Sequence, residues 1–381
     1  MDEFNDENLA YKTYKTIDEQ IKYLKENKKI IVLENQKYIL ENRNYISIIN
    51  PYKEFFATGH ITVEKNGIKA KLHQYGHDTL IDSIEKIAKL DDSMSTIFFE
   101  YIGNFERKFK NLLVSRICSL YNENCLTGLS KDIYCIKYLE EINAFLNNPA
   151  RENLPRFCAN FYNIIQKSKY LYSEYPIESR TCLLEKIYNI GLGISDESRN
   201  TLISHYIKLQ HKAPFWVIAN ALTLGELHIL YMMLDSGSQR WILSKMKNIE
   251  INKIRVKDIF DFSGQLELLR RIRNVTNHYE PIIPFFINTI KEKRIENSKM
   301  IEAIKTLKIV SDKIGFCDSS LNFPSIEEND YNIKKIRIIK LIISIISDDE
   351  NLLHADFLYC IKNWKDVSLQ VERHSALLRH N

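Results

Sequence analysis

Residues 258–279 read DIFDFSGQLELLRRIRNVTNHY, and Pro281 and Pro284 follow them closely. The stretch contains no proline, and its apolar side chains recur at the spacing of one helix face. We therefore expect a single long α-helix that ends before the two prolines. On a helical wheel, the apolar residues of its second half fall within about 60° of one another: Leu268, Ile272, Val275 and Tyr279.

Composition extends this expectation to the whole chain. Gly and Pro together supply only 19 of the 381 residues, about 5%, whereas roughly 12% is usual. So few turn-forming residues argue against a β-sandwich, a propeller or a Rossmann-type fold with many short loops. Hydrophobic residues make up 45% and charged residues 27% of the chain, which is enough apolar material for a packed core. We expect a mainly α-helical fold.

Two local signals predict a different N-terminal region. Thr16 and Glu19 form the Thr-x-x-Glu pattern of a capping box at the start of a helix. Residues 60–73 alternate apolar and polar side chains on both sides of Asn66-Gly67, which predicts a β-hairpin. We therefore divide the chain into a small N-terminal α/β appendage, a helical core and a C-terminal helical extension, over residues 1–80, 81–290 and 291–381.

The core is expected to consist of successive helices. The first runs from about residue 78 to 121, with a break and a new N-cap at Asp91-Asp92-Ser93. One or two helices are expected within residues 130–175. Further core helices are predicted over 178–190, 197–210, 224–234 and 238–247, and helices over 285–312, 330–347 and 351–378 continue into the C-terminal extension.

Charge, cysteine content and hydrophobic runs indicate the possible partners of the protein and its cell compartment. The net charge of +4 permits a nucleic-acid partner without requiring one. The seven cysteines are odd in number and form no Cys-x-x-Cys pair, as expected for reduced thiols in the cytoplasm. The N-terminus is too polar for a signal peptide, and the longest apolar run, residues 336–349, is too short to span a bilayer. We expect a cytoplasmic protein without a membrane partner.

The end of the long helix carries side chains suited to RNA phosphodiester cleavage. His278 can accept the proton of a 2′-hydroxyl or protonate the leaving 5′-oxygen, and Arg273 can stabilise charge on phosphate oxygens. Asn274 lies one helical turn from His278 and can orient the imidazole or hold a phosphate oxygen. This chemistry needs no metal ion or other cofactor. A two-fold homodimer would supply one histidine as the acid and the other as the base.

The pattern alone also fits an ordinary solvated helix face. Arginine followed by histidine at similar spacing recurs at Arg199 and His205. Two alternatives to a nuclease stay open: a module that binds a folded RNA without cleaving it, and a protein-interaction scaffold. The residues expected to contact RNA are Arg270, Arg271, Asn277, Tyr279, Arg240, Lys245, Lys247 and His205.

Four stretches add a resemblance to a known family. Three are residues 16–24, the tyrosine-rich residues 44–56, and residues 213–227, which carry a Pro-x-Trp-x₆-Thr-x-Gly-Glu pattern. The fourth is the Arg273-Asn274-x-x-x-His278 motif. Through these stretches the chain resembles the abortive-infection (Abi) family of the AbiD/AbiF type, whose members look like HEPN-superfamily ribonucleases.

The resemblance implies a HEPN-like helical bundle and a metal-independent endoribonuclease that acts in bacterial anti-phage defence as a homodimer. It places Arg273, Asn274 and His278 at the catalytic positions. Many relatives have a small residue before the histidine and a second histidine after it, where this chain has Asn277 and Tyr279. Relatives of the AbiF type are encoded beside a small structured non-coding RNA. The resemblance therefore implies an RNA partner that binds and restrains the enzyme, as in a toxin–antitoxin pair.

Overall fold

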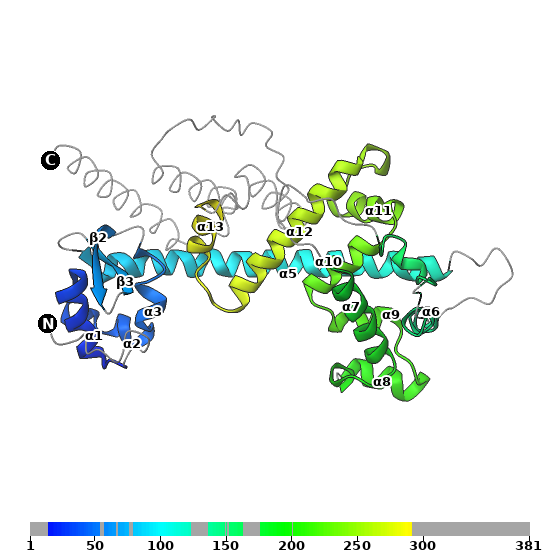
Figure 1. Ribbon diagram of the computed structural model, residues 1–381, viewed down its shortest axis with the longest axis horizontal. Coiled ribbons are helices and arrows are strands. Elements are labelled where there is room, and N and C mark those ends of the chain that lie inside the picture. The colour runs from blue at the N-terminus through cyan, green and yellow to red at the C-terminus, as the bar shows by residue number, and fades with distance from the viewer. Residues whose placement is uncertain are drawn as a thin grey trace. The chain divides into compact units, whose positions relative to one another are not determined.

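The computed structural model describes residues 14–53, 57–65, 68–75, 79–122, 136–148, 150, 152–162, 176–199 and 201–291. Within these residues the protein is mainly α-helical, with a β-hairpin near the N-terminus (Figure 1), which confirms the expected fold class. The helices predicted over 330–347 and 351–378, and the rest of the expected extension beyond residue 291, lie outside the described residues.

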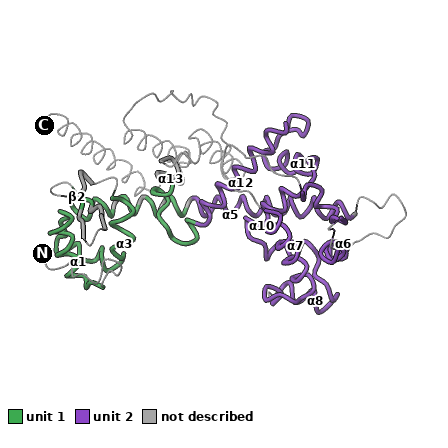
Figure 2. The backbone as a smooth tube through the Cα atoms, in the orientation of Figure 1, with its two compact units in different colours: residues 1–97, 275–288, 325–381 green, residues 98–274, 289–324 purple. Residues whose placement is uncertain are grey.

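The chain divides into two compact units (Figure 2). The first unit contains residues 1–97, 275–288 and 325–381, and the second contains 98–274 and 289–324. Two long helices, α5 (Ile81–Asn122) and α12 (Val256–Asn277), each contribute residues to both units. The three-part division expected near residues 80 and 290 stays a prediction.

The first unit begins with α1 (Ile17–Tyr23). The Thr16 side chain accepts a hydrogen bond from the Glu19 N–H at 3.4 Å, and the Glu19 carboxylate accepts one from the Thr16 N–H at 2.6 Å. The predicted capping box is therefore confirmed. Short elements follow: a π-helical turn at Leu24–Lys28, β1 (Ile30–Ile31), a 3₁₀ turn at Glu34–Gln36, α2 (Tyr38–Asn42) and α3 (Tyr45–Ile48).

The predicted β-hairpin is also confirmed. β2 (Ala57–Lys65) pairs antiparallel with β3 (Ile68–Tyr75), although the Asn66-Gly67 turn itself lies outside the described residues. In addition, β1 pairs in parallel with β4 (Thr79–Leu80). Sequence analysis did not find this second pairing, because strands of two residues are too short to show an alternating pattern.

The predicted break at Asp91-Asp92-Ser93 is wrong, because α5 continues through these residues. The two aspartates do not mark a helix boundary. Each forms hydrogen bonds or an ion pair with residues from distant parts of the chain. Asp91 is 2% exposed and accepts hydrogen bonds from Tyr52 and Ile283, while Asp92 pairs with Arg43. Tertiary partners thus explain acidic residues that look like a helix boundary in the sequence.

The helices of the second unit agree with most of the predictions. α7 (Ile177–Gly191), α10 (Leu224–Met233), α11 (Ser236–Lys247) and α12 start and end within two residues of their predicted bounds. The helix predicted over 197–210 is divided into a 3₁₀ turn and α8 (Thr201–Gln210). The remaining elements are α6 (Lys137–Leu146), a 3₁₀ turn at Arg156–Cys158, α9 (Phe215–Ile218) and 3₁₀ turns at Ala219–Ala221 and Ile251–Lys253.

An aromatic cluster in the second unit holds α12 against its neighbours. Phe262 of α12 packs against Tyr231 of α10 and against Phe105 and Phe109 of α5, with ring centroids 5.5–6.3 Å apart. All four rings are fully buried. Burial of this kind contributes roughly 1.5–3 kcal/mol per ring, and it fixes where α12 lies within the unit.

Gly103→Ala is expected to stabilise the protein. Gly103 is exposed on α5, and an added methyl would have no neighbour within 4 Å. Because alanine loses less backbone entropy than glycine in a helix, the free energy of unfolding should rise by about 0.5–1 kcal/mol in urea denaturation. Gly225→Ala is the control and should show no such gain, because its methyl would lie 3.0 Å from Arg270 Cδ. A loss of stability in Gly103→Ala would contradict the prediction.

Candidate active site at the end of helix α12

α12 ends at Asn277, and the chain then turns sharply at His278 and Tyr279. Tyr279 has a left-handed backbone with φ of 55°, and the Glu280 N–H donates to Val275 O at 2.9 Å. This geometry is that of a Schellman motif, in which glycine is the usual left-handed residue. Both the His278 imidazole and the Tyr279 ring are exposed. The turn therefore presents the predicted catalytic histidine at the surface of its unit.

A buried carboxylate fixes the start of the next helix, α13 (Ile282–Lys291). Asp91 Oδ1 accepts a hydrogen bond from the Ile283 N–H at 2.6 Å, and Oδ2 accepts one from the Tyr52 hydroxyl at 2.8 Å. Burial raises the pKa of Asp91 to about 7, although both hydrogen bonds favour the charged form. Asp91 thus accepts a hydrogen bond from the first turn of a helix that begins only four residues after His278, as an N-cap side chain would do.

Arg273 and Asn274 lie near the end of α12, and both are partly buried. Arg273 Nε lies 3.8 Å from Glu106 Oε2 of α5, and 32% of the Arg273 side chain is exposed. These two motif residues belong to the second unit, whereas His278 belongs to the first. The chain thus supplies the arginine and the histidine of the motif from different units.

Arg270 and Arg271 share a buried partner that sequence analysis missed. Glu267 accepts hydrogen bonds from Arg270 Nε at 2.8 Å and Nη2 at 2.6 Å, and from Arg271 Nε at 3.0 Å. The Glu267 side chain is only 2% exposed. Glu267 lies three residues before Arg270 and four before Arg271, and side chains at this spacing are neighbours on a helix. This spacing was the sequence signal that could have predicted the contacts. The two predicted RNA-binding arginines are therefore held on α12 rather than fully solvated.

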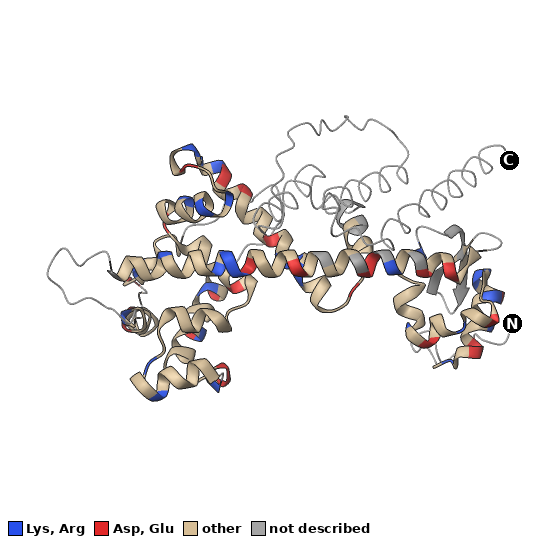
Figure 3. Ribbon diagram, turned by 180° about the vertical axis from the view of Figure 1, so that it is seen from behind, with Lys and Arg blue, Asp and Glu red and all other residues tan. Residues whose placement is uncertain are grey.

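The other predicted RNA-binding residues are distributed over several helices. Lys and Arg positions are mixed with Asp and Glu positions over the described helices (Figure 3). His205 is exposed on α8 and Lys245 is exposed on α11, where Arg240 and Lys247 are partly buried. Asn277 is partly buried at the end of α12. The structure thus brings Arg270 and Arg271 together at one carboxylate and places the rest on α8 and α11, at the end of α12, or, for Tyr279, in the turn that follows it.

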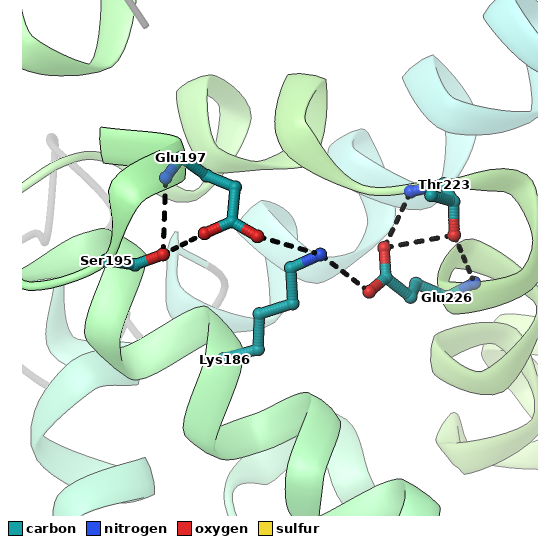
Figure 4. Close-up of polar contacts among 5 residues, drawn as sticks. All are labelled: Lys186, Ser195, Glu197, Thr223 and Glu226. Atoms are coloured by element: carbon teal, nitrogen blue, oxygen red, sulfur yellow. Dashed lines mark hydrogen bonds and ion pairs between the residues drawn. The ribbon is translucent and has the colours of Figure 1, made fainter. Parts of the chain in front are cut away.

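The Thr-x-Gly-Glu block makes structural contacts (Figure 4). The Glu226 N–H donates to Thr223 Oγ1 at 3.3 Å, and the Thr223 N–H donates to Glu226 Oε2 at 2.7 Å, which is a capping box at the start of α10. Glu226 also pairs with Lys186 of α7 at 2.8 Å, and Lys186 Nζ lies 3.5 Å from a Glu197 carboxylate oxygen. The block therefore starts α10 and ties it to α7.

A buried histidine that sequence analysis did not select joins α10 to α12. His228 is 1% exposed, and its Nε2 lies 2.8 Å from Ser263 Oγ. Burial lowers the pKa of His228 to about 4, which leaves the imidazole neutral at physiological pH. A neutral buried imidazole that is hydrogen-bonded to a hydroxyl fits a structural role in the helix packing.

Within the part of the chain that the structure describes, no group of three or more His, Cys, Asp or Glu side chains is arranged to hold a metal ion. None of the helices described is both long enough and apolar enough to cross a membrane.

Comparison with known protein families assigns the chain to a family. A family model described as Abi-like protein matches residues 38–284, more than half of the chain. The chain belongs to the Abi-like family. This Abi-like protein carries its β2–β3 hairpin, its Thr-x-Gly-Glu block and its Arg273-Asn274-x-x-x-His278 motif within the matched region. No curated protein and no solved structure matches the chain. The predicted membership of a bacterial abortive-infection family is confirmed at this level.

Asp91→Ala is expected to destabilise the protein strongly. The substitution leaves the Ile283 N–H and the Tyr52 hydroxyl without their buried acceptor, so the free energy of unfolding should fall by about 2–4 kcal/mol. Asp92→Ala is the matched control, because this neighbouring carboxylate is 58% exposed and pairs with Arg43. Its loss should stay below about 1 kcal/mol. Urea denaturation measures both, and equal losses would contradict the anchoring role of Asp91.

Acid is expected to destabilise the protein through His228. The folded pKa of about 4 lies below the ordinary value of 6.5, so the unfolded chain binds more protons in this interval. The contribution to stability is complete above pH 6.5 and is lost as the pH falls toward 4, by at most roughly 3 kcal/mol. In His228→Gln, the pH dependence of the unfolding free energy should flatten between these values.

The control for this titration is His205→Gln, because His205 is exposed on α8. This variant should keep the pH dependence of the wild type. An unchanged pH dependence in His228→Gln would show that the buried imidazole does not control acid stability.

Proposed function

We propose that this Abi-like protein is a HEPN-type endoribonuclease of the AbiD/AbiF type that cleaves RNA without a metal ion. The observation that carries the proposal is the exposed imidazole of His278, which directly follows the last residue of α12 in a member of an abortive-infection family. Arg273 lies five residues earlier and keeps part of its side chain exposed. An imidazole and a guanidinium together suit proton transfer and the stabilisation of charge on a phosphate.

In the proposed reaction, the 2′-oxygen of a ribose attacks the adjacent phosphorus while His278 takes the proton of the 2′-hydroxyl. The bond between phosphorus and the 5′-oxygen breaks, and that oxygen leaves with a proton from an acid. The products are a 2′,3′-cyclic phosphate and a 5′-hydroxyl. Arg273 stabilises the charge that builds up on the phosphate oxygens. Asn274 orients the imidazole or holds a phosphate oxygen.

The proposal includes a homodimer and an RNA inhibitor. One imidazole cannot be the base and the acid in the same step, so the partner subunit's His278 supplies the proton to the leaving oxygen. Cleavage of RNA in the bacterial cytoplasm would harm an uninfected cell. A small structured non-coding RNA that binds the enzyme and restrains it therefore belongs to the proposal, with release during phage infection.

A second candidate function is RNA binding without cleavage. One observation favours it: a carboxylate lies close to the arginine that would stabilise charge on the reacting phosphate. Glu106 Oε2 lies 3.8 Å from Arg273 Nε. This carboxylate competes with the reacting phosphate for the Arg273 guanidinium, which would weaken cleavage without affecting phosphate contacts elsewhere.

His278→Ala and Arg273→Ala are each expected to lower the rate of RNA cleavage about 100-fold or more, because each removes a group that acts on the reacting phosphate. The assay follows a labelled single-stranded RNA in the presence of EDTA and identifies the ends of the products. Lys257→Ala removes an exposed positive charge from the same helix and should retain activity.

The double variant decides between the two candidate functions. If Arg273→Ala combined with His278→Ala cleaves RNA at the wild-type rate and is as toxic in cells, the nuclease proposal is wrong. Salt-sensitive RNA binding that does not depend on His278, with no cleavage by the wild type, would support the binding function.

A further inference from the structure

A carboxylate in the second unit accepts hydrogen bonds from two guanidinium groups. Glu267 is buried on α12 and accepts hydrogen bonds from Arg270 through Nε and Nη2, and from Arg271 through Nε. Burial alone would raise the pKa of Glu267, but the two arginines outweigh this effect and hold the pKa below its usual value. With one negative and two positive charges, this cluster of Glu267, Arg270 and Arg271 has a net positive charge.

The two arginines differ in what their terminal nitrogens contact. Arg270 places both Nε and Nη2 on Glu267, whereas Arg271 donates to it from Nε only, at 3.0 Å. Among the residues that the structure describes, the two Nη atoms of Arg271 donate no hydrogen bond, and 29% of its side chain is exposed. The guanidinium of Arg271 is thus held at its inner nitrogen, and its two outer nitrogens remain available to a ligand.

Gly225 helps to keep the cluster in one arrangement. A Cβ atom at this position would lie 3.0 Å from Arg270 Cδ, so glycine leaves the space in which the Arg270 side chain packs. Arg270 in turn holds both oxygens of Glu267, at 2.8 Å and 2.6 Å. The carboxylate therefore has a defined orientation when it accepts the hydrogen bond from Arg271.

We propose that Glu267 is a positioning residue that orients Arg271 so that its outer nitrogens bind a phosphate of single-stranded RNA, without a role in bond cleavage. The identity of the ligand rests on the proposed function. The outer edge of a guanidinium presents parallel N–H donors that match two oxygens of a phosphate. A net positive charge beside this exposed edge favours an anion, and a protein that acts on RNA must hold a chain of phosphodiesters.

Glu267→Gln distinguishes two ways in which the cluster could bind RNA: through an Arg271 side chain oriented by Glu267, or through net positive charge alone. The substitution makes the cluster more positive by one charge, so attraction by charge alone would tighten RNA binding. Positioning predicts the opposite, because a neutral amide holds Arg271 less firmly. We expect the affinity for a fluorescently labelled single-stranded oligoribonucleotide, measured by anisotropy, to fall several-fold. The measurement is made in a His278→Ala background so that the RNA stays intact.

Arg271→Ala and Arg271→Lys test the guanidinium itself. Arg271→Ala should weaken binding about tenfold and reduce the slope of log affinity against log salt by about 0.7, the share of one phosphate on a single strand. Arg271→Lys keeps the charge but lacks the paired donors, so it should also lose affinity several-fold. In the cleavage assay with His278 intact, both variants should raise KM and leave kcat unchanged.

Lys257→Ala is the matched control, because it removes an exposed positive charge from the same helix. It should change the affinity less than about twofold, as expected for a charge away from the bound phosphate. If Glu267→Gln fails to fold, which circular dichroism shows, Arg271→Lys decides alone, since Arg271 is partly exposed. Unchanged or tighter binding in Arg271→Lys, or in folded Glu267→Gln, would overturn the proposal.

The results also separate this proposal from the proposed nuclease. If the protein binds RNA through Arg271 but never cleaves it, the phosphate site stands and the nuclease fails. If cleavage requires His278 but Arg271→Lys leaves affinity and KM unchanged, the nuclease stands and the phosphate site fails. A wild-type protein that binds no single-stranded RNA overturns the phosphate site.

Discussion

The buried carboxylate of Asp91 holds the chain just after His278, at the start of α13. It joins α5, the segment at Tyr52 and the first turn of α13, which lie far apart in the sequence. Ionisation of a buried aspartate is unfavourable, as its raised pKa shows, and the two hydrogen bonds offset part of this cost. Because α13 is fixed at its start, the backbone that leaves His278 has a defined end point only four residues away.

Local signals allowed much of the fold to be predicted. The capping box of Thr16 and Glu19, the β-hairpin and the long helix that ends before Pro281 all depend on residues close together in the chain. The predicted break at Asp91 failed for the opposite reason. Its partners Tyr52 and Ile283 are 39 and 192 residues away, and no local pattern distinguishes a tertiary partner from a helix cap.

Sequence analysis selected Arg273, Asn274 and His278 as the candidate site, but it did not find the carboxylates that lie beside the arginines. Periodicity places a residue on one side of a helix, but it does not show how deeply a neighbouring helix covers that side. Glu267 was therefore not selected, although it is buried and bonded to both Arg270 and Arg271. His228 was missed for a related reason, because its partner Ser263 lies 35 residues away on another helix.

Tyr279 occupies the position after α12 where glycine is the least costly residue. A non-glycine residue with this left-handed backbone costs on the order of 1 kcal/mol, and a tyrosine that is 95% exposed regains almost nothing from burial. The loss of backbone conformational entropy at this residue has already occurred during folding. A nucleobase or aromatic side chain that stacked on the phenol would restrict only the torsions of the tyrosine side chain, which makes the entropy loss on association small.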